Sequence, residues 1–589
     1  MKRVCGSPGS RNLQCILESR MNDQGQAGKM NRRDFLRLTS AGAAAAAVAA
    51  GTGVARAGAA SMATATAGEA SRSGQARRPN VIPLMDDQNT AGLSKRYGYP
   101  FDTMPIMDRL ASEGVDFTKA YCTMPACMPS RTSIFTGRWP SAHRVRSNYM
   151  SDAVFFERDI YDVAASCGYR TGLVGKNHTY LGPEKVDFWR IYNHTRGDRT
   201  NGDRKMLDAY ERWLDALEFN VSTTPTPFPV ETQFSHRIVT DAIDFIDQAG
   251  AQPFFLEVSF PDPHDPEQVP APYWDMFPPA SIPEPRANLG DLKKLGYRAE
   301  WLHDLEIDGF PATNKLWSRY LSNYLGSLRM IDDQVGRLVD HLKEKGLLDN
   351  TVIARISDHG DYLMKYGLAR KGVGMPETLI HVPMFWCGPG FHAAKNVGEN
   401  NFVSLADVMP TICEIMGAPI PRGVQGRSLL PLIRGENYPA AEFRSIYAEA
   451  GLGGLYYERE DRMPVSIARS GKTGWDELNG VTQSGCQRMV RMGKWKLVFD
   501  MMGYGQLHDL EKDPDELENL FGDPRFVAEQ AALMAELAMW TIRNTDSLPT
   551  GPQANSEVQF EKYQTKWATP HNWYAPHRRG ERHPVAFAP

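Results

Sequence analysis

One short stretch of the chain combines a reactive side chain with a nearby fixed cation. It runs Cys127-Met128-Pro129-Ser130-Arg131-Thr132-Ser133-Ile134-Phe135-Thr136-Gly137. A cysteine, a proline two residues on, then Ser-Arg and a Thr-Gly pair form an unusual local pattern. The plain structural alternative is a buried cysteine before a helix that begins with proline, because cysteine is among the most often buried residues. Other parts of the chain decide between the two.

Two clusters of oxygen donors follow apolar runs. Asp86 and Asp87 come directly after one run, and Asp358-His359-Gly360 follows another. Buried carboxylates are tolerated when they bind a metal or a cation, whereas a lone Asp-Asp pair serves equally well as a helix cap. Together the clusters supply enough donors for a divalent ion. Oxygen ligands favour Ca²⁺ or Mg²⁺, and His359 keeps Mn²⁺ open.

Cations and imidazoles occupy comparable positions elsewhere. Lys176 and His178 share one side of an extended segment, because side chains alternate along a strand. His264 lies in the proline-rich sequence 261–266, which holds its loop rigid, and Lys371 adds another positive charge. Taken singly, each of these residues would more often be a solvated surface group. Together they suit an anionic group that must also exchange a proton.

The elements that must position these clusters alternate between strand and helix. The apolar runs that precede the clusters are Val81 to Met85, Tyr169 to Val174, Phe254 to Phe260 and Val352 to Ser357, and helical spacing marks Thr103 to Glu113 and Tyr320 to Lys345. The alternation predicts an α/β fold with a large, mostly parallel central sheet flanked by helices. Because ligands collect outside the carboxyl ends of such strands, the clusters should converge on one site.

The composition changes after Gly435. The alternating sequence from Gln487 to Phe499 predicts a strand pair through a turn at Gly493, and Asp513-Pro514-Asp515-Glu516 is expected to start a helical stretch. A further helix is expected from Phe526 to Ile542. These features predict a smaller C-terminal subdomain, an antiparallel sheet with a helix. The expected organisation is a signal region at 1–57, a flexible linker at 58–78, a catalytic domain at 79–435, the C-terminal subdomain at 436–548 and a surface-wrapping or disordered tail at 549–589.

The start of the chain predicts export. Asn31-Arg32-Arg33-Asp34-Phe35-Leu36-Arg37 precedes an Ala-rich run from Leu38 to Ala50, and Ala55-Arg56-Ala57 offers a cleavage site. This order is typical of a twin-arginine signal, with translation beginning at Met21 or Met30 as an alternative start. The twin-arginine translocase is the expected partner, and the location is periplasmic or extracellular. No later segment holds 18 consecutive apolar residues, so the sequence predicts no transmembrane anchor.

Charge argues against nucleic acid as a partner. The 589 residues carry a formal charge of −4, and residues 1–57 hold nine Lys or Arg against three Asp or Glu, so the remainder carries −10. Binding to phosphate backbones needs clustered cations. The six cysteines after residue 57 show no CxxC and no metal-type spacing, which leaves disulfides undetermined.

The pattern around Cys127 resembles the signature of the type I, formylglycine-dependent sulfatases of the alkaline phosphatase superfamily. The resemblance extends in order and spacing from about Pro79 to Leu520. The matching pieces are Asn80 through Asp86-Asp87-Gln88, Gly175-Lys176-Asn177-His178, His264, Ser357-Asp358-His359-Gly360-Asp361, Lys371-Gly372, Val382-Pro383, Gly426-Arg427-Ser428-Leu429-Leu430, Lys494-Trp495-Lys496-Leu497 and Leu507-His508-Asp509-Leu510.

The resemblance implies a metal, most often Ca²⁺, and a modified cysteine. The metal ligands would be Asp86, Asp87, Asp358 and His359, completed by an oxygen of the modified Cys127. A formylglycine-generating enzyme would convert Cys127 to formylglycine during maturation, and the hydrated aldehyde would be the nucleophile. One hydroxyl would attack sulfur to form a covalent sulfate intermediate, and deprotonation of the other would release sulfate.

The remaining roles also follow from the resemblance. Arg131 and Lys176 would stabilise the modified residue. Lys371 and His264 would grip the sulfate, and His264 would protonate the departing oxygen. His178 would take the proton from the second hydroxyl. Such cations are needed because a sulfate monoester repels nucleophiles until its oxygens are neutralised.

The chain departs from the family pattern at several places. Pro83 interrupts the first strand, where proline costs a ladder hydrogen bond, and Arg355 falls inside an apolar run and must reach a partner or the surface. Residues 363–367 and His381 also differ from the usual pattern. The expected substrate is a sulfate ester, of a small molecule or of a sulfated sugar or polysaccharide, with aryl sulfates as surrogates. Loops at 138–148, 192–204 and 266–310 are expected to contact it.

Two alternatives remain open at this stage. A phosphonate or phosphate monoester hydrolase of the same superfamily can use the same modified residue, although Ser130 favours a sulfatase. A catalytically silent glycan-binding protein with unmodified Cys127 would have no need for the full metal and cation set. The sugar, the sulfated position, endo or exo action and the oligomeric state do not follow from the sequence.

Overall fold

A seven-stranded sheet positions the predicted clusters. The computed structural model describes residues 78–391, 397–453 and 485–545. The strand order is β2-β8-β7-β1-β6-β4-β5. Its strands are β1 (Asn80–Asp86), β2 (Val115–Asp116), β4 (Arg170–Lys176), β5 (Phe188–Tyr192), β6 (Phe254–Phe260), β7 (Thr351–Ser357) and β8 (Met384–Cys387). Strands β5, β4, β6, β1 and β7 pair in parallel, and β8 and β2 continue the sheet antiparallel.

The central strands are apolar because both faces of the sheet are covered. Every residue of β1, β6 and β7 is buried, as expected for parallel strands that carry helices on both faces. The helices of ten residues or more are α3 (Cys127–Thr136), α6 (Arg204–Ala216), α7 (Phe234–Ala249), α9 (Tyr297–Gly309), α10 (Trp317–Glu344) and α16 (Val527–Thr545). The shorter ones are α2 (Pro105–Glu113), α4 (Pro140–His143), α5 (Ile160–Ser166), α8 (Ala271–Trp274), α11 (Glu377–Ile380), α12 (Val397–Asn400), α13 (Val408–Ile415) and α14 (Leu430–Arg434).

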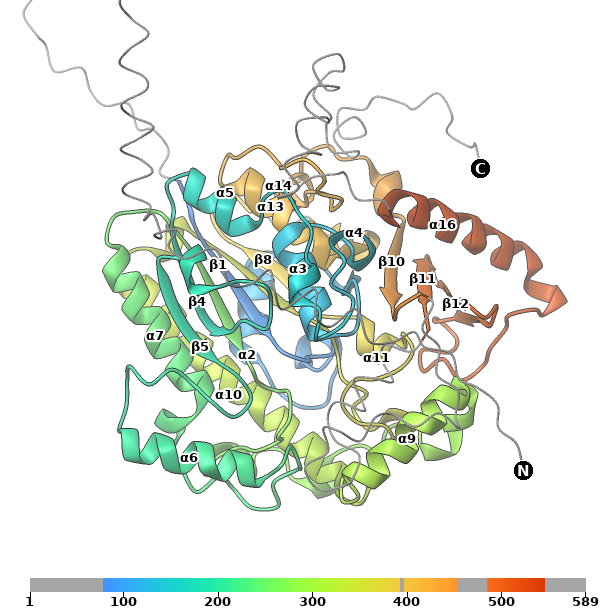
Figure 1. Ribbon diagram of the computed structural model, residues 1–589, viewed down its shortest axis with the longest axis horizontal. Coiled ribbons are helices and arrows are strands. Elements are labelled where there is room, and N and C mark those ends of the chain that lie inside the picture. Colours follow the sequence, from blue (N-terminus) through green and yellow to red (C-terminus); the bar gives the residue numbers. More distant parts are fainter. Residues whose placement is uncertain (1–77, 392–396, 454–484, 546–589) are drawn as a thin grey trace, which may run out of the picture. The chain divides into compact units, whose positions relative to one another are not determined.

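Two hydrophobic layers enclose the sheet. One joins α2, α7 and α10 to the strand face that carries Ile82 and Leu84. The other joins α3, α5 and α13 to the opposite face, which carries Val81 and Met85. Figure 1 shows α7 and α10 on one side of the strands and α5 and α13 on the other. Alternate residues of β1 therefore enter different cores, as the period of a strand requires.

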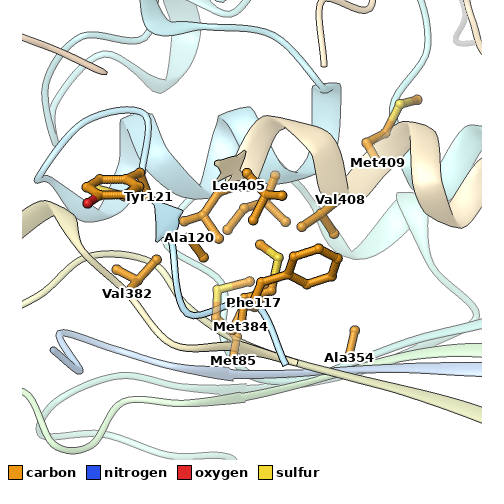
Figure 2. Close-up of a cluster of buried hydrophobic side chains, with 14 of the residues drawn as sticks. Met85, Phe117, Ala120, Tyr121, Ala354, Val382, Met384, Leu405, Val408 and Met409 are labelled. Atoms are coloured by element: carbon orange, nitrogen blue, oxygen red, sulfur yellow. The ribbon is translucent and has the colours of Figure 1, made fainter. Parts of the chain in front are cut away.

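In the second hydrophobic layer, side chains of the strands pack against α13 and the residues just before it. In Figure 2, Met85 and Ala354 on neighbouring strands face Leu405, Val408 and Met409. Phe117 and Met384 fill the space between the two sides. This packing anchors α3 indirectly, because α13 contacts both α3 and α5.

A second, four-stranded sheet forms the C-terminal part of the fold. Its strands are β10 (Ser445–Ala450), β11 (Gln487–Met492), β12 (Trp495–Asp500) and β13 (Gly505–Asp509), all antiparallel. Helix α16 packs on β11 and β12. A short parallel pair, β3 (Ala120–Tyr121) with β9 (Val403–Ser404), lies apart from both sheets. The structure therefore confirms the predicted fold class, and Gly493 forms the expected turn with a φ of 57°.

A buried lysine joins the C-terminal sheet to the main sheet's loops. Lys496 on β12 is fully buried, and its ammonium donates to the carbonyl of Met375 at 2.6 Å. The same ammonium lies 3.0 Å from Glu377 and 2.7 Å from Glu516. Two carboxylates and a carbonyl compensate the buried charge, which would otherwise be strongly unfavourable.

The prediction of a helix that starts at Asp513 is wrong. Residues 513–520 form turns and irregular backbone. Asp515 pairs with Lys365, and Glu516 adopts a left-handed φ of 54° while its carboxylate pairs with Lys496. These tertiary ion pairs outweigh the local preference for a helix.

Pro83 and Arg355, the two strand residues that depart from the family pattern, are both accommodated by their neighbours. Pairing of β1 with β6 includes Val81 and Leu84 but skips Ile82 and Pro83, because proline has no N–H to donate. Arg355 on β7 is buried and donates to Asp86 Oδ2 at 2.7 Å. The predicted signal region at 1–57, the tail at 549–589 and all but the last residue of the linker lie outside the described residues.

A buried carboxyl in the middle of the sheet makes stability depend on pH. Glu257 on β6 is fully buried and accepts a hydrogen bond from Tyr161 at 2.6 Å. Burial raises the pKa of Glu257 from its usual 4.5 to about 7, although Tyr161 and the charge of Arg131 oppose the shift. The unfolded chain thus loses this proton at lower pH than the folded chain, so the free energy of unfolding falls as pH rises through this window.

We predict that Glu257→Gln weakens this pH dependence. The wild-type free energy of unfolding should fall by about 3 kcal/mol between about pH 5 and about pH 8 through this group, and the variant should lose that fall. Thermal unfolding of both proteins across the window measures the difference. Glu344→Gln, at an exposed position of α10, is the matched control. Equal pH dependence in wild type and Glu257→Gln would contradict the assignment.

Candidate active site

Helix α3 presents Cys127 at the carboxyl edge of the main sheet. Cys127 is the first residue of the helix and is 1% exposed. The first turn of a helix has free N–H groups and a positive potential, which favour a negative charge there. Every residue of α3 is buried, and Gly137 ends the helix with a φ of 64°. The helix is therefore held on all sides while its first residue faces the strand ends.

Four ligand atoms, one of them the Cys127 sulfur, gather at this edge. They belong to Asp87, Cys127, Asp358 and His359, and all lie within 4.8 Å of one another. The Cys127 sulfur is 3.1 Å from His359 Nε2 and 3.6 Å from Asp87 Oδ1. All four side chains are buried. The structure thus brings together two loops that are 270 residues apart, since the backbone N–H of Gln88 also donates to Asp358.

The donor set fits a divalent cation. Ligand oxygens lie 2.3–2.6 Å from Ca²⁺, so ligands across one ion are separated by no more than about 5 Å. His359 Nδ1 lies 2.9 Å from the carbonyl of Gly360. That carbonyl can only accept, so Nδ1 carries the proton and the Nε2 lone pair faces the group. The Cβ of any other residue at 360 would lie 2.0 Å from the carbonyl of Thr378, which explains the glycine.

Asp86 lies outside this group of four. Its Oδ2 accepts from Arg355 at 2.7 Å and from Asn89 at 2.8 Å. Its Oδ1 is buried and has no hydrogen-bond partner among the described residues. Burial raises the pKa of Asp86 even though Arg355 and Asn89 oppose the shift. A buried carboxylate oxygen without a partner is a further feature that a cation would satisfy.

Arg131 connects the two acidic loops. Its fully buried guanidinium donates to Asp358 Oδ2 at 2.7 Å and to Asp87 Oδ2 at 3.3 Å. It also donates to the carbonyl of Lys176 at 2.9 Å and to the hydroxyl of Ser259 at 2.8 Å. Arg131 therefore contacts the carboxyl ends of strands β4 and β6 and the loops after β1 and β7.

Lys176 and His178 approach Cys127 from the end of β4. The Lys176 ammonium contacts Asp87 Oδ2 and lies 3.7 Å from the Cys127 sulfur. His178 hydrogen-bonds the same thiol. The strand can reach this position because residue 175 is glycine, where a Cβ would lie 1.7 Å from the carbonyl of Ser259.

His264 and Lys371 form a second pair of an imidazole and an ammonium. Lys371 Nζ lies 2.8 Å from His264 Nε2 and donates to Gln88 Oε1 at 2.8 Å. The other ring nitrogen of His264 lies 3.0 Å from the carbonyl of Asp265. Burial opposes the charged form of Lys371, but the anions at Cys127 and Asp87 raise its pKa overall. Asp87, Arg131, Lys176, His178, Asp358 and His359 thus lie around Cys127, whereas Lys371 and His264 contact each other and reach this group through Gln88 and His194.

The charges around Cys127 favour an anion at its side-chain position. Burial alone would raise the pKa of the Cys127 thiol, but Lys176, Lys371 and His359 hold it well below the ordinary value. The same position in a modified residue would stabilise a developing oxyanion for the same electrostatic reason.

His194 is a further residue of the site, and it was not predicted from the sequence. Its Nε2 lies 2.9 Å from Lys176 Nζ, and its ring stacks on that of His264. His194 follows the carboxyl end of β5 by two residues. That position, a polar residue after a strand, is the same signal that marked the other clusters, but β5 was not among the predicted strands.

A separate cavity lies away from this site. It measures about 380 Å³ and lies between the 293–299 segment, residues 373–376 and the C-terminal sheet. None of the predicted site residues lines it. The charged groups Arg298 and Asp500 in its wall pair with each other, and Glu516 pairs with Lys496.

Strand order, helix layers and a buried cysteine within a metal-type donor set define an α/β protein with a candidate active site at the carboxyl edge of its sheet. The sulfatase family model matches residues 79–418, more than half of the chain. The chain therefore belongs to the sulfatase family, the enzymes that hydrolyse sulfuric esters.

Individual relatives agree with this assignment. The chain is 28% identical to an arylsulfatase of Clostridium perfringens over 474 residues, which cover 76% of this chain and 91% of the relative. It is 25% identical to an N-acetylglucosamine-6-O-sulfatase of Bacteroides thetaiotaomicron over 528 residues, 78% of this chain and 86% of the relative. A phosphonate monoester hydrolase of Agrobacterium radiobacter has the same fold, with a TM-score of 0.65 at 22% identity, covering 79% and 96% of the two chains.

We predict that Ca²⁺ binds to and stabilises the protein. At a free ion concentration of about 100 times the dissociation constant, binding should add about 3 kcal/mol to the free energy of unfolding. Calorimetric titration of the metal-stripped protein, with thermal unfolding at graded Ca²⁺, measures both effects. Asp358→Ala should abolish them, whereas Asp340→Ala on the exposed side of α10 should not. Unchanged ion binding by Asp358→Ala would exclude this donor set.

Proposed function

We propose that the enzyme hydrolyses a sulfate ester of a sulfated sugar or polysaccharide, using formylglycine made from Cys127. The observation that carries the proposal is the convergence of three donor groups and three cations, Arg131, Lys176 and Lys371, around one buried cysteine. A core cysteine would not require this arrangement, because buried charges are unfavourable unless they serve each other or a ligand. In this structure the Cys127 sulfur stands in for an oxygen of the hydrated aldehyde.

The hydrated aldehyde supplies two hydroxyls on one carbon, one to attack sulfur and one whose deprotonation releases sulfate. A divalent ion, for which we propose Ca²⁺, would supply positive charge to this site. Asp86, Asp87, Asp358 and His359 are the proposed ligands. Arg131 orients two of these carboxylates through direct hydrogen bonds.

Lys176 and His178 serve the nucleophile in this proposal. The Lys176 ammonium contacts both Asp87 and the Cys127 side-chain position, where it stabilises negative charge. His178 hydrogen-bonds the same position and is the proposed proton acceptor. Burial lowers the pKa of His178, although its bond to Cys127 opposes the shift, so the imidazole is neutral and ready to accept a proton.

Lys371 and His264 serve the substrate. Their 2.8 Å contact places an ammonium donor beside an imidazole nitrogen. The ammonium neutralises sulfate oxygens as charge moves toward the leaving group. His264 donates a proton to the departing oxygen, while Lys371, whose pKa is raised, keeps its positive charge beside the sulfate.

The sugar assignment rests on similarity. The relative named N-acetylglucosamine-6-O-sulfatase covers most of this chain. Export through the twin-arginine pathway to the periplasm or the outside suits a polymeric substrate that does not enter cells. In the described part of the chain, no helix is long and apolar enough to cross a membrane.

We predict that protein from its native host carries formylglycine at residue 127. The tryptic peptide should be lighter by about 18 Da than its unmodified form, the difference between CH₂–SH and CHO. The modified protein should turn over sulfate esters faster than matched phosphate esters. Cys127→Ala should abolish turnover, and Cys122→Ala, at a buried cysteine on the other side of the signature, should retain it.

The outcomes separate the alternatives. Active protein with an unmodified thiol would overturn the proposed chemistry. Preference for phosphate or phosphonate esters would assign the other activity of the superfamily. Protein with an unmodified thiol and no turnover of any ester, but with glycan binding, would identify a silent binding protein.

A further inference from the structure

His194 makes two contacts that the proposed chemistry does not use. Its Nε2 lies 2.9 Å from the Lys176 ammonium. Its ring stacks on His264 with centroids 3.8 Å apart and planes inclined by 25°. Lys176 and His264 serve opposite ends of the reaction, the nucleophile and the leaving group. His194 contacts both Lys176 and His264 and so connects these two residues.

The contact with Lys176 defines the state of the His194 ring. An ammonium can only donate hydrogen bonds, so Nε2 must accept and the neutral ring carries its proton on Nδ1. Burial and the neighbouring charges of His264 and Lys176 hold the pKa of His194 well below its usual range. His194 is therefore an uncharged acceptor that directs one N–H of Lys176 away from Cys127.

The contact with His264 leaves that ring little freedom. One nitrogen of His264 faces the carbonyl of Asp265, and the other faces Lys371. These two contacts fix the edges of the ring, and the His194 ring covers one face. Phe219 supports His194 from behind, edge to face at 6.2 Å. The orientation of the proposed proton donor is thus set on its edges and on a face.

Space beside the two histidines is small. A cavity of about 10 Å³, the room needed by one water, is lined by His194, His264, Asp262 and Gln268. His194 Nδ1 is buried and has no hydrogen-bond partner among the residues described. A water in this cavity would accept a hydrogen bond from the Nδ1–H group without movement of either ring.

We propose that His194 is a positioning residue that fixes the Lys176 ammonium and the His264 ring relative to each other. The inference rests on the proposed function and adds a residue to it. Its two contacts have different consequences. Loss of the stacked ring frees His264 and weakens protonation of the leaving oxygen. Loss of the acceptor nitrogen displaces Lys176 and weakens stabilisation of the nucleophile, whatever the leaving group.

Two substitutions separate these contacts. His194→Phe keeps an aromatic ring against His264 but removes the acceptor. His194→Gln offers a carbonyl oxygen where Nε2 lies but removes the ring. The probes are 4-nitrophenyl sulfate, whose leaving oxygen is weakly basic, and phenyl sulfate, whose leaving oxygen is more basic and depends more on a proton donor.

We predict different patterns of kcat/KM for the two variants. His194→Gln should lower kcat/KM about three- to tenfold more for phenyl sulfate than for 4-nitrophenyl sulfate, a factor in line with loss of an aromatic stack. His194→Phe should lower both by the same factor. Crystal structures of the variants supply a readout besides turnover: the His264 ring should move in His194→Gln and stay in His194→Phe.

Controls make the test decisive. His341→Gln, on α10 and bonded to Asp247, should match wild type with both esters. Equal losses with both esters in both variants, or an unmoved His264 ring in His194→Gln, would overturn the positioning role. Failure of the proposed function looks different, because wild type itself would then turn over neither sulfate.

Discussion

The buried guanidinium of Arg131 is the interaction on which the active site depends. Two carboxylates, Asp87 and Asp358, lie in its hydrogen-bonding range, and neither is exposed to water. Without a cation between them, two buried carboxylates would repel each other and lose hydration. Arg131 is the residue that allows the loops after β1 and β7 to meet at the first turn of α3. Its bonds to the carbonyl of Lys176 and to Ser259 extend the same constraint to β4 and β6.

Much of this arrangement could be predicted from the sequence because polar clusters follow buried strands. Asp87, Lys176, His264 and Asp358 each follow or end a strand of the parallel sheet, whose carboxyl ends meet at one edge. The rule of strand polarity therefore placed residues hundreds of positions apart at one site. The long helix α10 was predicted within three residues at each end, since its apolar spacing extends over 28 residues.

What could not be predicted depends on tertiary contacts with weak local signals. The partner of Arg355 depends on the pairing of β7 with β1, which places that guanidinium against Asp86. Glu516 gave a local helix signal that the ion pair with Lys496 overrides. His194 follows β5, an edge strand that is only partly buried and lacks the continuous apolar run that marks the inner strands. Its position opposite Lys176 and His264 is a property of the folded sheet.

The C-terminal sheet takes part in the site through the segment that carries Lys371. At the start of that segment, Asp361 accepts hydrogen bonds from Gln88 and Tyr320, both within the catalytic part of the fold. At its end, Glu377 and the carbonyl of Met375 are held by Lys496 of β12. Lys371 lies between these two anchors, and its ammonium lies 2.8 Å from His264. Because the first anchor belongs to the loop after β1 and to α10 and the second to β12, the small sheet helps to position the proposed sulfate-binding cation as well as adding buried surface.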